Sequence, residues 1–311
     1  MSEGKCLVVG GAGFIGVKIV QKLIEMGYEV TVVDNLSNSD GKLLNKLKCE
    51  FIKQDVSDVR VVEMFSKYSL KYIFNFGSPS TDRFFTFDGK GTCETIRGML
   101  NIIEIAKVTG ASSIIYPSSG TVYGNLSPPQ SEVMKTKPKS MYACTKTFLE
   151  NISDTVNIKG LNIAGIRIFT GYGEGEIAKS PDSRSVVSLF YDSISRDIPP
   201  IVYGNGEQKR DFVYVDDIAN IAIKVAKSNF RGIVNVGSGA STSFNHLIEL
   251  LNSKLGKSVK PRYMPSPIAH ISETRADISK LRDEIGYLPV SIEEGIEMYL
   301  NRIKIVEKIY Q

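Results

Sequence analysis

A glycine-rich turn between an apolar strand and a helical pattern constrains the fold of this chain most. Residues 6–9 are typical of a buried strand, and apolar side chains recur at helical spacing over residues 15–24. Between them, Gly10 permits a tight turn, Gly13 lets the backbone approach an anion, and Gly16 lets the helix pack closely. The turn therefore predicts a pyrophosphate site at a helix N-terminus. The alternative, a turn without a ligand, is disfavoured by the strand and helix on either side.

Two aspartates follow the next predicted strands. The strand over residues 29–33 ends in Asp34, eighteen residues beyond Gly16, and the strand over residues 50–54 ends in Asp55. A carboxylate at the first position accepts hydrogen bonds from both ribose hydroxyls and repels a 2′-phosphate, so it predicts NAD rather than NADP. Either aspartate could instead cap a helix or shape a turn.

Strands and helices alternate through the first half of the chain. Helical patterns over residues 59–68 and 98–108 alternate with apolar strands, which we place at 72–76, 112–116 and 164–169. This alternation predicts an α/β fold with a doubly wound parallel sheet of the Rossmann type. The glycine- and acid-rich segment 171–183 predicts a substrate-side loop or a crossing into a smaller C-terminal domain. We expect a dinucleotide-binding domain of residues 1–169 plus 211–240, and a substrate domain of residues 170–210 plus 241–311.

Composition excludes several classes of protein. The 311 residues are 42% hydrophobic and 23% charged, as in globular proteins. No apolar run approaches the roughly 20 residues of a membrane helix, and no signal segment is evident, so we expect a cytoplasmic location. A net charge of +4 is not a nucleic-acid footprint but suits a small anionic substrate. Two histidines and four scattered cysteines disfavour a catalytic triad and a metal site.

Tyr142 and Lys146 are the candidate catalytic pair. They lie one turn apart on one face of a predicted helix. A free tyrosine has a pKa near 10, so acting as a base at pH 7 requires about 4 kcal/mol in favour of the phenolate. A neighbouring ammonium and the positive nicotinamide ring have the right sign. Nearby, Ser118 and Ser119 follow a strand, where open parallel sheets bind ligands, so Ser119 could hydrogen-bond a reacting hydroxyl.

Together these residues resemble the extended short-chain dehydrogenases/reductases of the nucleotide-sugar epimerase and dehydratase group. The resemblance covers nearly the whole chain and includes segments 210–217, 235–239 and 274–280. It implies NAD as the cofactor and a nucleoside-diphosphate sugar as the substrate, while the net charge and the lack of a long apolar run indicate neither a nucleic-acid nor a membrane partner. It also implies that Tyr142 is the base, that Lys146 binds the nicotinamide ribose, and that Ser119 orients the sugar. A homodimer through helices near Gly98 and Tyr142 is a further implication.

The resemblance assigns binding roles residue by residue. The predicted cofactor-binding residues are Gly10, Gly13, Phe14, Ile15, Gly16, Asp34, Asn35, Asp55, Val56, Phe76, Tyr142 and Lys146. The predicted substrate-binding residues are Ser78, Ser118, Ser119, Thr121, Tyr142, Thr170, Arg210, Arg275 and Asp277. Arg210 and Arg275 resemble the arginines that grip the substrate diphosphate, which suits a bidentate guanidinium. A surface ion pair of Arg210 with Asp211, and a helix-start charge at Arg275, are the alternatives.

Two positions after the catalytic serine indicate the reaction. Related dehydratases and decarboxylases carry acids there, whereas this chain has Gly120 and Thr121. Without an acid to eliminate water, the resemblance favours a 4-epimerase. A dehydrogenase that releases a 4-keto sugar, a decarboxylase or dehydratase of the same family, and a non-catalytic NAD-binding regulator are the alternatives. The presence of Ser119, Tyr142 and Lys146 argues against the regulator.

Three departures from the family pattern lie on the substrate side. Segment 75–80 resembles the decarboxylase branch, while Thr95 and Thr170 each replace a usual asparagine. These departures predict an unusual sugar, such as a uronic acid.

Overall fold

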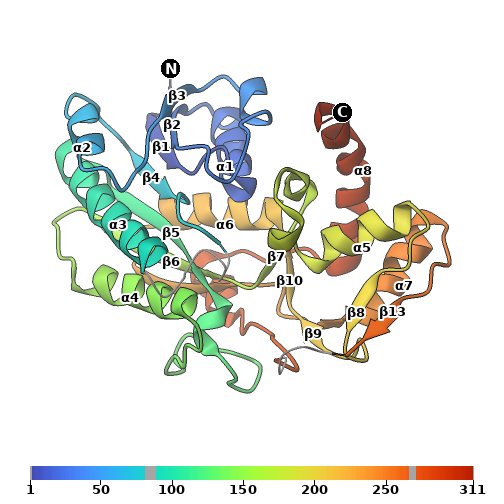
Figure 1. The fold of residues 1–311 in the computed structure, drawn as a ribbon. Coiled ribbons are helices and arrows are strands. Elements are labelled where there is room, and N and C mark those ends of the chain that lie inside the picture. The colour runs from blue at the N-terminus through green and yellow to red at the C-terminus, as the bar shows by residue number, and fades with distance from the viewer. Residues whose placement is uncertain (1, 81–88, 266–270, 311) are drawn as a thin grey trace.

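A single parallel sheet organises the molecule. The computed structural model describes residues 2–80, 89–265 and 271–310 (Figure 1). In spatial order the sheet strands are β11 (Gly232–Val236), β6 (Asn162–Ile168), β5 (Ser113–Ser119), β4 (Tyr72–Asn75), β1 (Lys5–Val9), β2 (Glu29–Asp34) and β3 (Glu50–Lys53). The strand order reverses direction between β1 and β4, which is the switch point where doubly wound sheets bind ligands. The predicted Rossmann-type fold is confirmed.

Helices cover both faces of this sheet. They are α1 (Phe14–Glu25), α2 (Arg60–Met64), α3 (Lys90–Thr109), α4 (Met141–Thr155) and α6 (Val215–Lys227). Alternate residues of β1 point to opposite faces: Cys6 and Val8 pack in the core with α1 and α6, whereas Leu7 and Val9 pack in the core with α2, α3 and α4. Burial on both faces explains why central strands such as β1 are continuous apolar runs, whereas the edge strand β3 is largely exposed.

The C-terminal elements surround a separate core. They include α5 (Val186–Ser195), α7 (Phe244–Leu255) and α8 (Ile292–Tyr310), whose buried apolar side chains pack together. Two short strand pairs join them: β8 (Ile201–Tyr203) with β13 (Arg262–Met264), and β9 (Lys209–Arg210) with β12 (Thr242–Ser243). The chain leaves the main sheet after β6 and returns at β11. The exact two-domain division stays a prediction. Within the described ranges, no helix has both the length and the apolar character of a membrane span.

The predicted strands end within one to three residues of the observed ones, and three other segments differ more. Helix α3 begins eight residues before the predicted start, where its polar first turns contact α4 through a hydrogen bond of 3.0 Å between Thr92 Oγ1 and Thr145 Oγ1. Helix α2 is shorter than predicted. Segment 171–183 is not a simple loop, because β7 (Thr170–Tyr172) pairs with β10 (Phe212–Tyr214) and short helical turns η4 (Glu174–Ala178) and η5 (Pro181–Ser183) follow. Because β7 pairs with a strand that begins 40 residues beyond its own end, no local sequence pattern indicates that it is a strand.

The remaining elements are single turns. They are η1 (Leu44–Lys46), η3 (Gly120–Tyr123) and a π-helical turn, η6 (Leu281–Ile285).

Candidate active site

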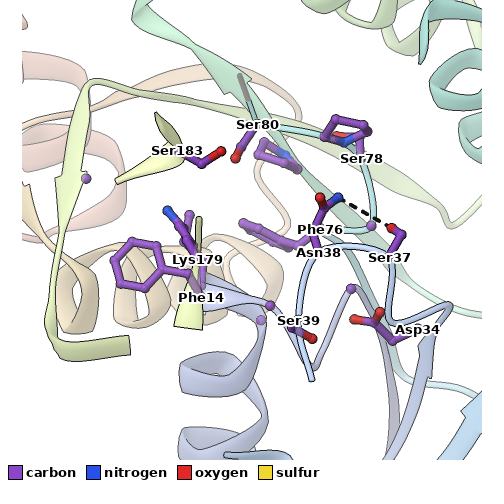
Figure 2. Close-up of a pocket in the computed structure, with 18 of the residues that line it drawn as sticks. Phe14, Asp34, Ser37, Asn38, Ser39, Phe76, Ser78, Ser80, Lys179 and Ser183 are labelled. Carbon is purple, nitrogen blue, oxygen red and sulfur yellow. Dashed lines mark hydrogen bonds between the residues drawn. The ribbon is translucent and has the colours of Figure 1, made fainter. Parts of the chain in front are cut away.

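A cavity of about 900 Å³ opens at the carboxyl ends of the sheet strands (Figure 2). Its lining includes every predicted cofactor-binding residue, from the glycine turn to Lys146. Of the predicted substrate-binding residues, the lining includes Ser78, Ser118, Ser119, Thr121, Tyr142 and Thr170. The glycine turn and the candidate catalytic residues therefore share one cavity.

The glycine turn forms a cradle that larger residues could not build. Gly10 has a φ of +73°, and a Cβ there would lie 2.3 Å from the Phe76 carbonyl oxygen. A Cβ on Gly16 would lie 2.0 Å from the Gly10 carbonyl oxygen, so the turn and α1 pack backbone to backbone. Gly13 has no side chain with which to cap α1, which leaves the first-turn N–H groups for an anion. These features fit the pyrophosphate of a dinucleotide.

Asp34 joins the glycine turn to the loop after β2. Its Oδ2 accepts a hydrogen bond of 3.0 Å from the Ala12 N–H, and its Oδ1 accepts one of 2.8 Å from the Leu36 N–H. Burial raises the pKa of this carboxyl. Leu36 adopts a left-handed φ of 59°, which turns the loop back along the cavity. Each carboxylate oxygen keeps a further lone pair for a ribose hydroxyl.

Asp55 shapes a turn at the cavity wall, and its cofactor-binding role stays a prediction. Its Oδ1 accepts a 2.8 Å hydrogen bond from the Ser57 N–H, as in an Asx turn, and its Oδ2 accepts one from Asn35 Nδ2. The same residue lines the cavity beside Val56. The aspartate therefore shapes the turn that carries it into the site.

Helix α4 brings Tyr142 and Lys146 to the cavity together. Ser140 caps this helix by accepting a hydrogen bond from the Ala143 N–H. Lys146 is 1% exposed, and its Nζ donates a 2.9 Å hydrogen bond to Ser78 Oγ and lies 5.4 Å from the centroid of the Tyr142 ring. Burial lowers the pKa of Lys146 to about 7. A bound group with hydroxyl or anionic oxygens would help to satisfy this buried ammonium.

Ser119 reaches the cavity from the end of β5. Its Oγ accepts hydrogen bonds from the Thr121 N–H at 3.2 Å and from Thr121 Oγ1 at 3.0 Å. Gly120 lies between Ser119 and Thr121. A Cβ added to Gly120 would lie only 3.3 Å from ring carbons of Phe169, so the ring packs closely against this glycine. The serine is thus held by its own turn, as expected for a group that must orient a hydroxyl.

A buried polar network beneath this site was not predicted. Arg167 donates two hydrogen bonds of 2.8 Å to the Glu150 carboxylate and one of 2.8 Å to the Tyr123 hydroxyl, which donates to Asn235 Oδ1. Ser118 donates its hydroxyl hydrogen bond to Glu150. The network connects α4 with β5 and β6, and its Ser118 adjoins the candidate catalytic Ser119. A charged residue inside the apolar strand at 167 was the available signal, because buried arginines need partners.

Three predicted substrate residues lie outside the residues that line the cavity: Arg210, Arg275 and Asp277. Arg210 Nη1 donates to the carbonyl oxygens of Lys209 and Ile271, and the guanidinium lies 5.8 Å from the centroid of the Phe244 ring. Burial lowers the pKa of Arg210. Their substrate roles stay predictions.

The neighbouring acid groups have their own partners. Asp211 is fully buried and accepts hydrogen bonds from Ser238, Gly239 and the Ala276 N–H, rather than forming a surface pair with Arg210. Asp277 accepts a 2.9 Å hydrogen bond from the Ser279 N–H. The Asp211 contacts hold Ser238, Gly239 and Ala276 beside the residue that joins β9 to β10, whereas the Asp277 contact is local to its own turn.

Lys179 and Tyr310 are two of the lining residues that the sequence did not indicate. Figure 2 shows Lys179 beside Phe14, with its Nζ 4.2 Å from the centroid of the ring. Lys179 also pairs with Glu176 at 3.4 Å. Tyr310 lines the cavity from the far end of the chain. Lys179 lies in a segment that the sequence predicted to be a loop. No sequence pattern near Tyr310 indicates that it lines a cavity.

Comparisons with known proteins show the family of this chain. A family model described as the NAD dependent epimerase/dehydratase family matches residues 6–237. UDP-glucuronate 4-epimerase of Thermodesulfobacterium geofontis is 34% identical over 313 residues, covering 96% of this chain and 95% of the relative.

Two solved structures share the fold. UDP-N-acetylglucosamine 4-epimerase of Methanobrevibacter ruminantium, in complex with UDP-N-acetylmuramic acid, has a TM-score of 0.90 at 29% identity and covers 99% of this chain and 100% of its own. UDP-glucuronic acid 4-epimerase of Bacillus cereus, in complex with UDP-glucuronic acid and NAD, has a TM-score of 0.85 at 25% identity, with coverages of 97% and 99%.

Proposed function

Because the chain belongs to the NAD-dependent epimerase/dehydratase family, we propose that it inverts C4 of a nucleoside-diphosphate sugar. The observation that carries this proposal is the meeting of Ser119, Tyr142 and Lys146 in the cavity that contains the glycine turn. Gly120 and Thr121 add no acid for the elimination of water. The cavity therefore holds the groups for reversible oxidation of a hydroxyl and lacks, at these positions, the acid of a dehydratase.

NAD bound in this cavity would supply a reversible hydride acceptor for C4. Tyr142 removes the proton of the C4 hydroxyl as the general base, and Ser119 holds that hydroxyl by a hydrogen bond. The Lys146 ammonium favours the phenolate, which must be stabilised by about 4 kcal/mol at pH 7. After the sugar ring turns over, Tyr142 returns the proton to the C4 oxygen. The substrate leaves with inverted stereochemistry and an unchanged redox state.

The polar lining supports a hexose or hexuronic acid as the sugar. Hydroxyls of Ser78, Ser80 and Ser183 line the cavity together with the Lys179 ammonium (Figure 2). Lys179 pairs with Glu176 at 3.4 Å, and the C6 carboxylate of a uronic acid would share this ammonium among the hydroxyls. The relative named UDP-glucuronate 4-epimerase is consistent with this choice.

Product identification tests the proposal directly. The purified protein is incubated separately with UDP-glucose, UDP-glucuronic acid and UDP-N-acetylglucosamine, and the products are identified by NMR. We expect a C4 epimer of at least one sugar, with no accumulation of NADH. A stable 4-keto sugar formed with one equivalent of NADH, a 4-keto-6-deoxy sugar, or release of carbon dioxide would contradict the epimerase.

We also propose a homodimer through α3 and α4. These helices pack against each other and leave Leu100 and Phe148 about half exposed. Light scattering after size-exclusion chromatography should give twice the mass of 34.3 kDa, and Phe148→Glu should reduce it towards the monomer. An unmodified protein that elutes as a monomer would contradict this arrangement.

A further inference from the structure

The last turn of α8 reaches the loop that follows β2. Tyr310 lies 270 residues from Asp40 in the sequence, yet its hydroxyl donates a 3.3 Å hydrogen bond to Asp40 Oδ1. Lys42 Nζ lies 5.1 Å from the centroid of the Tyr310 ring and 3.5 Å from Asp40 Oδ2. Figure 1 shows the C-terminal end of α8 on the same side of the molecule as α1. The phenol of Tyr310, the carboxylate of Asp40 and the ammonium of Lys42 thus join the last turn of α8 to the loop after β2.

This contact lies at the cofactor end of the cavity. Tyr310 lines the same cavity as Asp34, Ser39 and Asp40. Asp34 is the carboxylate expected to bind the adenosine ribose, and the loop it begins carries Asp40 to the tyrosine. The candidate catalytic residues come instead from β5 and α4. Tyr310 is therefore placed to act on the cofactor rather than on the reacting sugar.

Helix α8 is anchored before it reaches the loop. Arg302 Nη1 donates a 2.7 Å hydrogen bond to Asp216 Oδ2 on α6, and the Tyr191 hydroxyl donates one of 3.2 Å to Glu307 Oε1. Ile303 is 2% exposed in the C-terminal core. Because these contacts fix the helix, its last turn is a rigid support for the loop rather than a loose end.

We propose that Tyr310 is a cofactor-binding residue that holds the loop 35–42 closed and slows the release of NAD. For the cofactor to leave past this loop, the contacts of Tyr310 with Asp40 and Lys42 have to break. The ring also offers apolar contact area to the nucleoside. The inference depends on NAD as the cofactor and not on the identity of the sugar.

The test measures cofactor release without any sugar. Protein loaded with NADH is mixed with excess NAD, and the loss of bound-NADH fluorescence gives the dissociation rate. We expect Tyr310→Ala to release NADH about tenfold faster, which corresponds to about 1.4 kcal/mol. Tyr310→Phe, which keeps the ring and loses the hydrogen bond to Asp40, should give a smaller increase.

Ile305→Ala is the matched control. Ile305 is on the same helix and 65% exposed, and five residues of helix place it about 140° around the axis from Tyr310. Its release rate should equal that of the unmodified protein. If Tyr310→Ala releases NADH no faster than Ile305→Ala, or only lowers the melting temperature of the cofactor-free protein, the inference is overturned. Because the assay contains no sugar, a failed epimerase assay leaves this result interpretable.

Discussion

Two regions of this molecule are built by different means. The cofactor side contains the glycine turn and the other predicted cofactor-binding residues, and the arginine side contains Arg210, Arg275 and Asp277. On the cofactor side, many of the predicted residues follow the carboxyl end of a parallel strand, and all of them line one cavity. On the arginine side, Arg210 lies on the two-residue strand β9, and Arg275 and Asp277 lie beyond it, outside that lining. A long parallel sheet places its strand ends in a common row, whereas short strand pairs depend on contacts between distant segments.

Two aspartates, the partly buried Asp34 and the fully buried Asp211, show the same difference. Asp34 accepts a hydrogen bond from the Ala12 N–H, which is 22 residues away in the sequence and in the same strand–helix–strand unit. Asp211 spans 65 residues to reach the Ala276 N–H. A contact within one strand–helix–strand unit, such as that of Asp34, can be predicted from residue spacing. A contact between distant segments, such as that of Asp211, forms only when the whole chain has folded. The experiments below separate the two sides by substituting residues on each.

The largest effect is expected at the catalytic base. Tyr142→Phe removes the phenol oxygen and should lower turnover by about a hundredfold or more, the usual scale for a lost general base. NAD binding and the melting temperature should change little, because the ring remains. Turnover is measured by NMR on whichever sugar the panel identifies. Near-normal turnover in this variant would remove Tyr142 from the mechanism.

The arginine side should respond through substrate binding. If Arg210 and Arg275 grip the diphosphate, Arg210→Met and Arg275→Met should each raise KM about tenfold or more, because hydrogen bonds to charged groups contribute about 1.5–3 kcal/mol. NADH binding, measured by fluorescence, should stay normal in both variants.

Arg282→Met is the matched control for these substitutions. Arg282 lies in the same C-terminal region, is exposed, and pairs with the neighbouring Asp283 at 2.7 Å. Its KM should match that of the unmodified protein. If all three variants have the same KM, the diphosphate contacts lie elsewhere.

On the cofactor side, we expect a smaller effect from a substitution that changes the preference between NAD and NADP. Asp34→Asn removes the charge that repels a 2′-phosphate, so it should narrow the preference for NAD over NADP by several-fold to about tenfold. Binding titrations of both cofactors on the unmodified and substituted proteins measure the change. Equal affinity for the two cofactors in the unmodified protein would contradict the role given to Asp34.

The smallest effect is a pH dependence of stability caused by Lys146. Its pKa is about 7 in the folded protein and 10.5 when unperturbed, so the unfolded chain holds more protons between these values. The stability of the cofactor-free protein should therefore rise with pH through this window, by about 1 kcal/mol from pH 7 to pH 8 from this group. Urea unfolding of the unmodified protein and of Lys146→Met measures the difference. Parallel pH profiles would show that the lysine is not desolvated.

Much of the cofactor side could be predicted because its signals are local. The Gly10–Gly16 spacing, the position of Asp34, and the four-residue step from Tyr142 to Lys146 are each read within one or two elements. Helix boundaries were less accurate. The first turns of α3 are polar and are stabilised by contact with α4, so their periodicity did not reveal them.

The sequence by itself determined the sheet, the glycine cradle and the candidate catalytic pair, because spacing and apolar periodicity act over a few residues. Tertiary structure decided the rest. The Glu150 and Arg167 pair forms only when α4 packs on β6, and Tyr310 meets Asp40 only when α8 is fixed by contacts with other helices. Such contacts join residues whose separation in the chain has no fixed period, so no local pattern identifies the partner, even where a single residue such as Arg167 indicates that one is needed.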